Sequence, residues 1–173
     1  MALDAPAHGA SGSKIFNAIL YAQFIGVVCK KFNPSILIGH SVGGMAISYF
    51  LKSNSNYKAN KLLFLGVPAG FPAIFKNYSD LMGYNKKVRA GMEVVIQKRF
   101  GVPSSHFNTA IFVKEIKGEC LIIHDEFDPV IPYSDAQEIH KAFKNSQMFT
   151  TQGLGHGLKS KKVIEKIIDF IQG

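Results

Sequence analysis

The sequence contains no tryptophan, only two arginines and little charge for its length. Of its 173 residues, 18% are charged and 47% are hydrophobic, whereas about a quarter of an average soluble domain is charged. A chain of this length fits one domain and is long enough to bury a core. We therefore expect a single domain over residues 1–173, with much apolar surface to bury.

The scarcity of arginine bears on the class of partner. The formal net charge is +8, but Arg89 and Arg99 are the only arginines, and the lysines are spread from Lys14 to Lys166. Recognition of bases and phosphates relies on arginine forks and on basic residues gathered on one face. We therefore expect no nucleic-acid partner.

Cysteine and long apolar runs are also scarce. Cys29 and Cys120 lie in apolar stretches without a C-x-x-C or metal spacing, which predicts buried, reduced thiols, a cytoplasmic location and no metal. The most hydrophobic run, 15–29, contains Asn17 and Gln23 and is too short to cross a bilayer. It also lacks the flanks of a signal peptide, so it indicates a buried helix and no membrane span.

Short apolar strands alternate with helical patterns along the chain. The strands are expected at 35–39, 61–66, 119–124 and 147–151. The helices are expected at 14–31, 41–52, 133–144 and 160–171. Strands that are apolar on both faces and joined by helices indicate an α/β fold with a mainly parallel, covered sheet.

One long segment, about 70–117, interrupts this alternation. It has no apolar strand pattern and is rich in Phe, Lys and Asn. A plain loop of that length is unusual inside a domain, so we expect a small helical lid over the carboxyl ends of the strands.

A glycine-rich turn joins the strand at 35–39 to the following helix. Gly39-His40-Ser41-Val42-Gly43 matches G-x-S-x-G in the strand–turn–helix setting that lifts a nucleophilic serine clear of the backbone. The glycines are expected where a Cβ would clash with the strand or helix. The N–H of Val42, at the helix N-terminus, would face an oxyanion. The other interpretation is a turn in which Ser41 only caps the helix.

A serine hydroxyl needs a general base, and His156 is the main candidate. It lies in the glycine-rich loop Gly153-Leu154-Gly155-His156-Gly157, directly after the last strand. His106, in the lid segment, is the second candidate. The remaining histidines fit other positions: a turn, the serine turn itself, a strand end and a helix surface (His8, His40, His124 and His140).

The base in turn needs a carboxylate to fix its tautomer. Asp125, Glu126 and Asp128 crowd the carboxyl end of the strand at 119–124, the edge at which α/β sites form. We favour Asp128, with Asp125 second and Glu126 third. The alternative is a solvated acidic turn before Pro129.

Together these pieces resemble the α/β-hydrolase superfamily, and its esterases and lipases in particular. The order Ser41, Asp128, His156 is the order of that family, and the D-x-x-D-P-x-x-P and G-L-G-H-G runs look like its acid and histidine loops. The resemblance implies a serine hydrolase that cleaves a small carboxylic ester or thioester through an acyl-enzyme, with no cofactor. Acyl transfer would differ only in the acceptor. Dehalogenase and epoxide-hydrolase chemistry is disfavoured, because it needs Asp at the position of Ser41.

The lid supplies candidate substrate contacts. Phe71, Phe75, Leu81 and Met82 suggest an apolar acyl pocket beneath it. Packing of these side chains within the core or the lid is the competing interpretation, because aromatic residues dominate cores in general.

The resemblance also implies features that the sequence does not contain. The family's first three strands and its H-G oxyanion loop have no counterpart before Ser41, and loss of one oxyanion donor costs roughly 10²–10³ in rate. Without the third of those strands, the strand at 35–39 would be an exposed apolar edge, through which the chain could self-associate. A truncated, weakly active or inactive remnant that acts as a binding module is therefore the second hypothesis.

Overall fold

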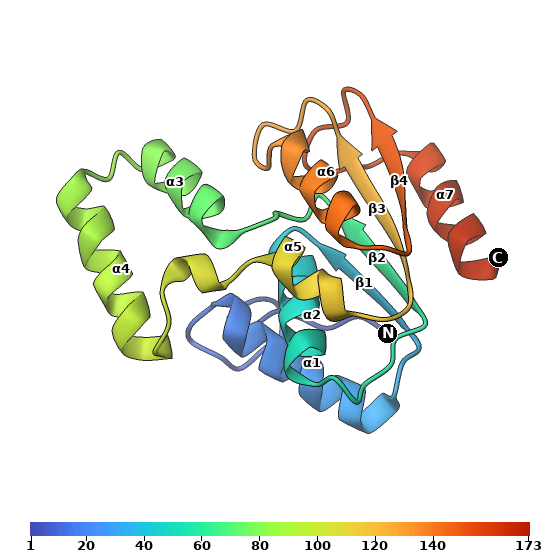
Figure 1. The fold of residues 1–173 in the computed structure, drawn as a ribbon, viewed down its shortest axis with the longest axis horizontal. Coiled ribbons are helices and arrows are strands. Elements are labelled where there is room, and N and C mark those ends of the chain that lie inside the picture. Colours follow the sequence, from blue (N-terminus) through green and yellow to red (C-terminus); the bar gives the residue numbers. More distant parts are fainter.

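Four parallel strands form one sheet, in the order β1-β2-β3-β4 across its width (Figure 1). They are β1 (Ile36–His40), β2 (Lys61–Leu65), β3 (Glu119–Asp125) and β4 (Ser146–Thr151). The computed structural model describes residues 1–173, apart from the side chain of Leu81. All four predicted strands are present within a residue at each end, and the α/β class with a parallel sheet is confirmed.

Helices connect the strands and cover the sheet. They are α1 (Ala18–Phe32), α2 (Val42–Ser53), α3 (Phe71–Leu81), α4 (Lys86–Phe100), α5 (Thr109–Phe112), α6 (Tyr133–Ala142) and α7 (Lys161–Gln172), with short 3₁₀ turns η1 (Ser104–His106) and η2 (Val113–Glu115). The first helix begins four residues later than predicted. Its cap is the reason, because the Asn17 side chain accepts a hydrogen bond from Leu20 N–H at 2.8 Å.

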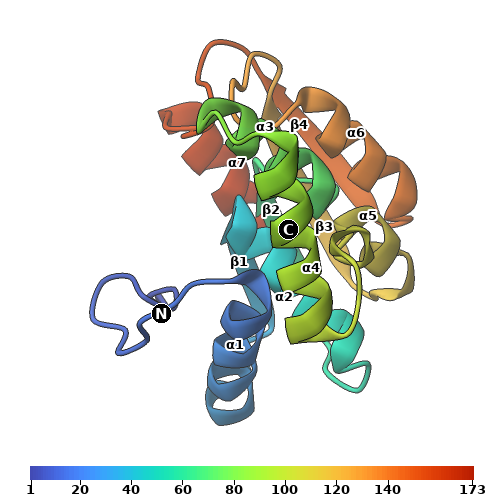
Figure 2. The ribbon, with the colours of Figure 1, turned by 90° about the vertical axis from the view of Figure 1, so that its left-hand side faces the viewer.

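The sheet is buried between two hydrophobic clusters. On one face Leu62, Phe64 and Ile122 pack with residues of α1, α2, α5 and α6. On the other face Leu121 and Ile123 pack against α7. Because successive side chains of a strand point to opposite faces, the apolar run of β3 supplies both clusters. Figures 1 and 2 show α7 alone on its side of the sheet.

The segment 70–117 divides into two parts. Helices α3 and α4 project from the body on the left of Figure 1, and α4 lies nearest the viewer in Figure 2. We call residues 71–107 the cap. The cap begins and ends at one point, because Phe71 N–H donates to Phe107 O at 2.9 Å and Gly70 pairs with Asn108 in a β-bridge.

The rest of the segment belongs to the body. Ala110, Phe112 and Val113 are each at most 3% exposed, and α5 packs against α2 and α6. The helical insertion predicted over 70–117 is therefore confined to the cap. Whether the cap moves as a lid stays a prediction.

The strand β1 lies at one edge of the sheet and pairs only with β2. Residues 1–3 form no strand, and Leu3 packs against the core. Ile38, in the middle of β1, is 52% exposed. This edge carries unpaired backbone groups and apolar side chains.

The cysteines lie in the core, and the helices are short. Cys29 and Cys120 are both buried, and neither forms a disulfide among the described residues. Not one of the helices described is both long and apolar enough to cross a bilayer.

Candidate active site

The candidate residues follow the carboxyl ends of four neighbouring strands. Ser41 directly follows β1, Gly66 directly follows β2, Asp128 comes three residues after β3, and His156 lies in the loop after β4. Because the strands are parallel, these ends meet at the same edge of the sheet, where sites of α/β folds form.

Ser41 occupies a strained position between β1 and α2. Its backbone has φ 53° and ψ −126°, which L residues rarely adopt. The turn is tied to the sheet by the Ser41 N–H, which donates to Leu65 O at 2.8 Å. Strain of this kind clusters at functional sites, and a helix cap needs none; Ser41 makes no side-chain capping bond.

Two glycines of this turn are required for close packing, and a third is not. A Cβ on Gly39 would lie 2.5 Å from Gly44 N, and one on Gly44 would lie 2.2 Å from Val67 Cγ2. A Cβ on Gly43 would meet only Tyr21, at an ordinary 3.6 Å. The expected clash therefore holds for Gly39, while the second close approach involves Gly44, one residue beyond the G-x-S-x-G pattern.

Asp128 and His156 form a direct pair. The Nδ1 of His156 lies 2.7 Å from Asp128 Oδ2. The Asp128 side chain is fully buried, and that of His156 is 20% exposed. The other carboxylate oxygen of Asp128 accepts hydrogen bonds from the backbone N–H groups of Val130 and Ile131, at 2.8 and 3.0 Å.

These contacts set the charge of Asp128. Burial alone would raise the pKa of its carboxyl group, but the bonds from Ile131 N–H, His156 and Val130 N–H outweigh it, so that the pKa is lowered. Asp128 is therefore ionised at neutral pH. An ionised carboxylate keeps the proton of His156 on Nδ1 and leaves Nε2 free to accept one.

Asp125, the second acidic candidate, has a different position. It is fully buried, and its oxygens accept hydrogen bonds from the side chain of Thr151 and from backbone N–H groups of Phe127, Gly153 and Leu154. Burial raises the pKa of this carboxyl group, and the bonds from Leu154, Thr151 and Phe127 outweigh it and lower the pKa. Asp125 thus ties the end of β3 to the loop that carries His156.

The remaining candidates lie elsewhere. Glu126 is exposed and accepts a hydrogen bond from Gln152. His106 packs against Phe107 at the base of the cap, with ring centroids 5.5 Å apart. His8 bonds Pro6 O within the N-terminal turn. None of these side chains contacts Asp128 in the described structure.

His40 has a role that the sequence did not indicate. Its Nε2 lies 2.8 Å from the backbone carbonyl of His156, and the two rings are 4.7 Å apart between centroids. The residue before Ser41 thus contacts the loop of the candidate base. The only signal in the sequence was a histidine inside the G-x-S-x-G pattern.

Gly66 connects the serine turn to the pair of Asp128 and His156. Its φ is +57°, and an added Cβ would lie 3.2 Å from His156 Nδ1. Its neighbour Leu65 accepts the Ser41 N–H. Ser41 and His156 therefore lie on adjacent positions of the sheet edge. In the described structure no hydrogen bond joins Ser41 Oγ to His156. In enzymes without bound substrate, the hydrogen bond between nucleophile and base is often long and shortens when substrate binds.

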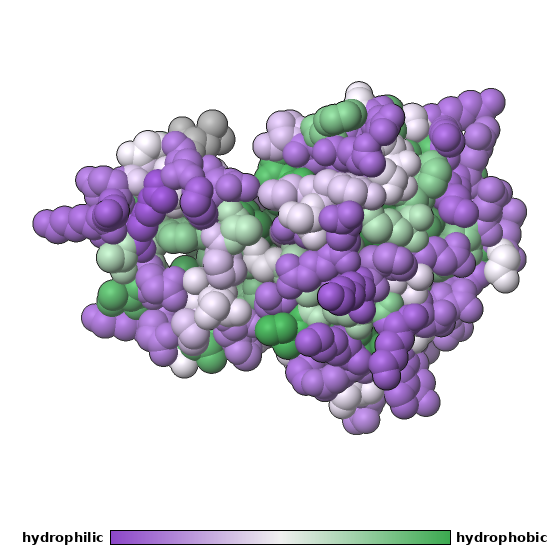
Figure 3. Space-filling view, turned by 45° about the horizontal axis from the view of Figure 1, so that its top comes forward, coloured by the Kyte–Doolittle hydropathy of each residue, from purple (hydrophilic) through white to green (hydrophobic). Residues whose placement is uncertain are grey.

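An apolar cavity of about 530 Å³ lies between the cap and the start of α1. Phe71 and Phe75 line it and stack on each other, with ring centroids 5.9 Å apart. Met82 does not line it and is 50% exposed at the end of α3. The side chain of Leu81 lies outside what the structure describes. Figure 3 shows mainly hydrophilic residues on the outer surface of the cap and hydrophobic ones between cap and body.

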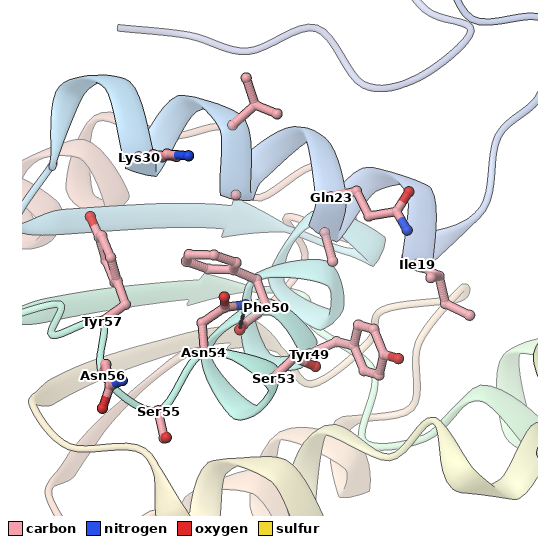
Figure 4. A pocket seen from close by; sticks show the side chains of 13 residues that line it. Ile19, Gln23, Lys30, Tyr49, Phe50, Ser53, Asn54, Ser55, Asn56 and Tyr57 are labelled. Carbon is pink, nitrogen blue, oxygen red and sulfur yellow. Dashed lines mark hydrogen bonds between the residues drawn. The ribbon is translucent and has the colours of Figure 1, made fainter.

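A second groove, of about 910 Å³, lies away from these residues. It runs between α1 and the C-terminal end of α2, where the Asn54 amide donates to Phe50 O at 2.8 Å (Figure 4). At about 1.5 Å per residue, that end of α2 is roughly 18 Å from Ser41. Neither Ser41, Asp128 nor His156 lines this groove. Among the described residues, no cluster of three or more His, Cys, Asp or Glu side chains could hold a metal ion.

Comparisons with known proteins agree with the fold. A family model described as TAP-like protein, of the α/β-hydrolase type, matches residues 103–172. No curated protein matches the sequence. Among solved structures, an esterase from Exiguobacterium antarcticum is 18% identical, with 98% of this chain and 80% of that one covered and a TM-score of 0.74.

Two further structures have the same fold. A bromoperoxidase from Bacillus anthracis is 16% identical over 98% of this chain and 80% of its own, with a TM-score of 0.72. An α/β-hydrolase enzyme from a sediment metagenome of the Mar Chica lagoon, Morocco, is 18% identical over 90% and 69%, with a TM-score of 0.64. At these identities the likeness concerns the architecture of the chain.

Proposed function

This chain has the α/β-hydrolase fold, and from that premise we propose that it is a serine hydrolase of carboxylic esters or thioesters. Ser41 is the nucleophile, His156 the general base, and Asp128 the carboxylate that orients His156. Val42 N–H is the oxyanion donor, since the first residue of a helix has no carbonyl partner within it.

The reaction proceeds in two halves. His156 Nε2 takes the proton of Ser41 as Oγ attacks the acyl carbon, and it returns that proton to the departing alcohol or thiol. Water, activated by the same nitrogen, then attacks the acyl-enzyme and releases the carboxylic acid. Ser41 regains its proton, so no oxidant, metal or further reactant is needed.

The single observation that supports this proposal most is the pair of Asp128 and His156. The distance between Asp128 Oδ2 and His156 Nδ1 is 2.7 Å. The pair lies against Gly66, and the residue before Gly66, Leu65, accepts the Ser41 N–H on its carbonyl oxygen. Three residues that are far apart in the sequence thus share one edge of the sheet. A serine in a strained turn beside a buried acid–imidazole pair fits acyl transfer to a hydroxyl.

Labelling by a fluorophosphonate tests the proposal directly. We expect the purified chain to be labelled at Ser41, as located by peptide mass spectrometry, and to hydrolyse a p-nitrophenyl ester. Ser41→Ala should abolish labelling and lower kcat by about 10⁴-fold or more. A folded wild-type chain that neither reacts with the probe nor hydrolyses the ester would contradict the proposal.

Under the proposed function the cavity beneath the cap is the candidate acyl site, although neither Ser41 nor His156 lines it. Phe71 and Phe75 offer it an apolar wall, and the cavity of about 530 Å³ is within the range of small-molecule sites. From this apolar lining we propose an uncharged, apolar acyl chain. Met82, which is half exposed and does not line this cavity, is not part of the proposed substrate site.

A second candidate function is association through the free edge of β1. Ile38 is 52% exposed there, and an apolar groove of about 540 Å³ follows the strand. We propose that two copies pair through their β1 edges about a two-fold axis, which would satisfy the unpaired backbone groups of both. This proposal is independent of catalysis.

Ile38→Lys tests that association. We expect the wild-type chain to increase in mass with concentration in light scattering, and Ile38→Lys to stay monomeric because the charge cannot be buried in the pairing. Ile164→Lys is the matched control, since Ile164 is similarly exposed, at 58%, on α7. A wild-type chain that is monomeric at all concentrations would rule out the pairing.

A further inference from the structure

A buried histidine lies beneath the pair of Asp128 and His156. His124 is the penultimate residue of β3, in register with Thr150 of β4, and it is fully buried. The four residues before it in the strand are apolar and also buried. An imidazole in such surroundings is costly unless its nitrogens have partners.

Only one of its nitrogens has a partner. His124 Nε2 lies 3.0 Å from Ile131 O and 3.6 Å from Asp128 Oδ2. His124 Nδ1 has no hydrogen-bond partner among the described residues. Since both neighbours of Nε2 are acceptors, Nε2 carries the proton and donates it to Ile131 O.

That hydrogen bond completes a clamp on the acid loop. Ile131 N–H donates to Asp128 Oδ1, and Ile131 O accepts from His124, so both backbone groups of Ile131 are fixed. The loop between Asp128 and Ile131 therefore cannot rotate without breaking one of the two bonds. His124 Nε2 also lies 3.6 Å from Asp128 Oδ2, the oxygen that binds His156.

We propose that His124 is a positioning residue for Asp128: it holds the carboxylate in the orientation that the His156 imidazole requires. The inference rests on the proposed function, in which Asp128 orients the base. His124 touches no substrate. The other polar groups around it belong to α6, where Tyr133 packs with its ring 6.1 Å away and the Asp135 carboxylate accepts the Ala69 N–H.

Two amide variants separate positioning from packing. The amide nitrogen of Gln reaches about as far along the side chain as Nε2, whereas that of Asn reaches only as far as Nδ1. His124→Gln can therefore still donate to Ile131 O, and His124→Asn cannot. Both place an uncharged amide of similar polarity in the same site.

We expect His124→Asn to lower kcat by about 10- to 100-fold with KM within about twofold, because small misplacements of catalytic groups have effects of this size. His124→Gln should stay within about threefold of the wild type. In an Asp128→Asn background the two variants should have equal kcat, since the group that they position no longer works. Equal losses in both backgrounds, or no loss for His124→Asn, would overturn the proposal.

A second measurement is independent of activity. The imidazole N–H of His156 that bonds Asp128 should give its own proton resonance, present in the wild type and in His124→Gln and shifted or lost in His124→Asn. If the wild-type chain hydrolyses no ester, the proposed function fails while this resonance still tests the role of His124. A resonance unchanged in His124→Asn would contradict the positioning role in either case.

Discussion

Asp128→Asn is expected to lower kcat for a p-nitrophenyl ester by about 10⁴-fold while the chain stays folded. The Asn oxygen can still accept the N–H groups of Val130 and Ile131, so the loop keeps its shape. The amide nitrogen, however, would face His156 Nδ1, which then has to accept a hydrogen bond. The imidazole proton moves to Nε2, and the base can no longer take the proton of Ser41.

Stopped-flow or steady-state kinetics check this prediction. The melting temperature of each variant shows whether the chain stays folded. Glu126→Gln is the matched control, because it removes an acid two residues away that is exposed and bonded to Gln152. Its kcat should equal that of the wild type. An Asp128→Asn variant that keeps more than a tenth of the activity would show that another group orients the base.

Asp125→Ala should instead lower the free energy of unfolding, by about 3–5 kcal/mol. The carboxylate accepts from Phe127, Gly153 and Leu154 N–H and from the Thr151 hydroxyl, and alanine leaves these donors unpaired. Since two of them lie in the loop that carries His156, activity should fall as well. Urea denaturation measures the loss, with Asp125→Asn expected to lose less because its oxygen can still accept.

The pH dependence of the melting temperature tests this role of Asp125 independently. Its folded-state pKa is lowered, so its contribution is complete above the unfolded pKa of about 3.9 and is lost as pH falls through the folded value. Between pH 7 and pH 3 the melting temperature of the wild type should therefore fall further than that of Asp125→Asn. Asp80 and Asp128, whose pKa values are also lowered, are present in both chains and cancel in the comparison. Parallel curves would contradict the assignment.

The strands and the main helices were predictable because their hydrophobic patterns are long and regular. The β3 run is apolar on both faces, and the amphipathic pattern of 160–171 was strong enough to place α7 within a residue. Errors arose where a local hydrogen bond decides a boundary, as at Asn17, whose side chain delays the start of α1. The sequence predicts one insertion over 70–117, because its periodicity does not reveal that Ala110 and Phe112 pack between α2 and α6.

For the candidate site, the sequence indicated residue types but not contacts. The sequence favours Asp128 over Asp125, and the fold shows what each does: Asp128 binds His156, whereas Asp125 binds the backbone of the loop that carries it. The contact of His40 with the His156 loop and the lack of room above Gly66 depend on residues far apart in the chain. No local pattern encodes such distances.

The point where the cap joins the body would allow the cap to be exchanged during evolution. Because Phe71 and Phe107 are hydrogen-bonded to each other and Gly70 pairs with Asn108, residues 71–107 leave the body and return to it at a single point. An exchange of everything beyond that point alters the wall of the cavity but neither the sheet nor the loops at its edge. Under the proposed function, the acyl preference could therefore change while Ser41, Asp128 and His156 keep their positions.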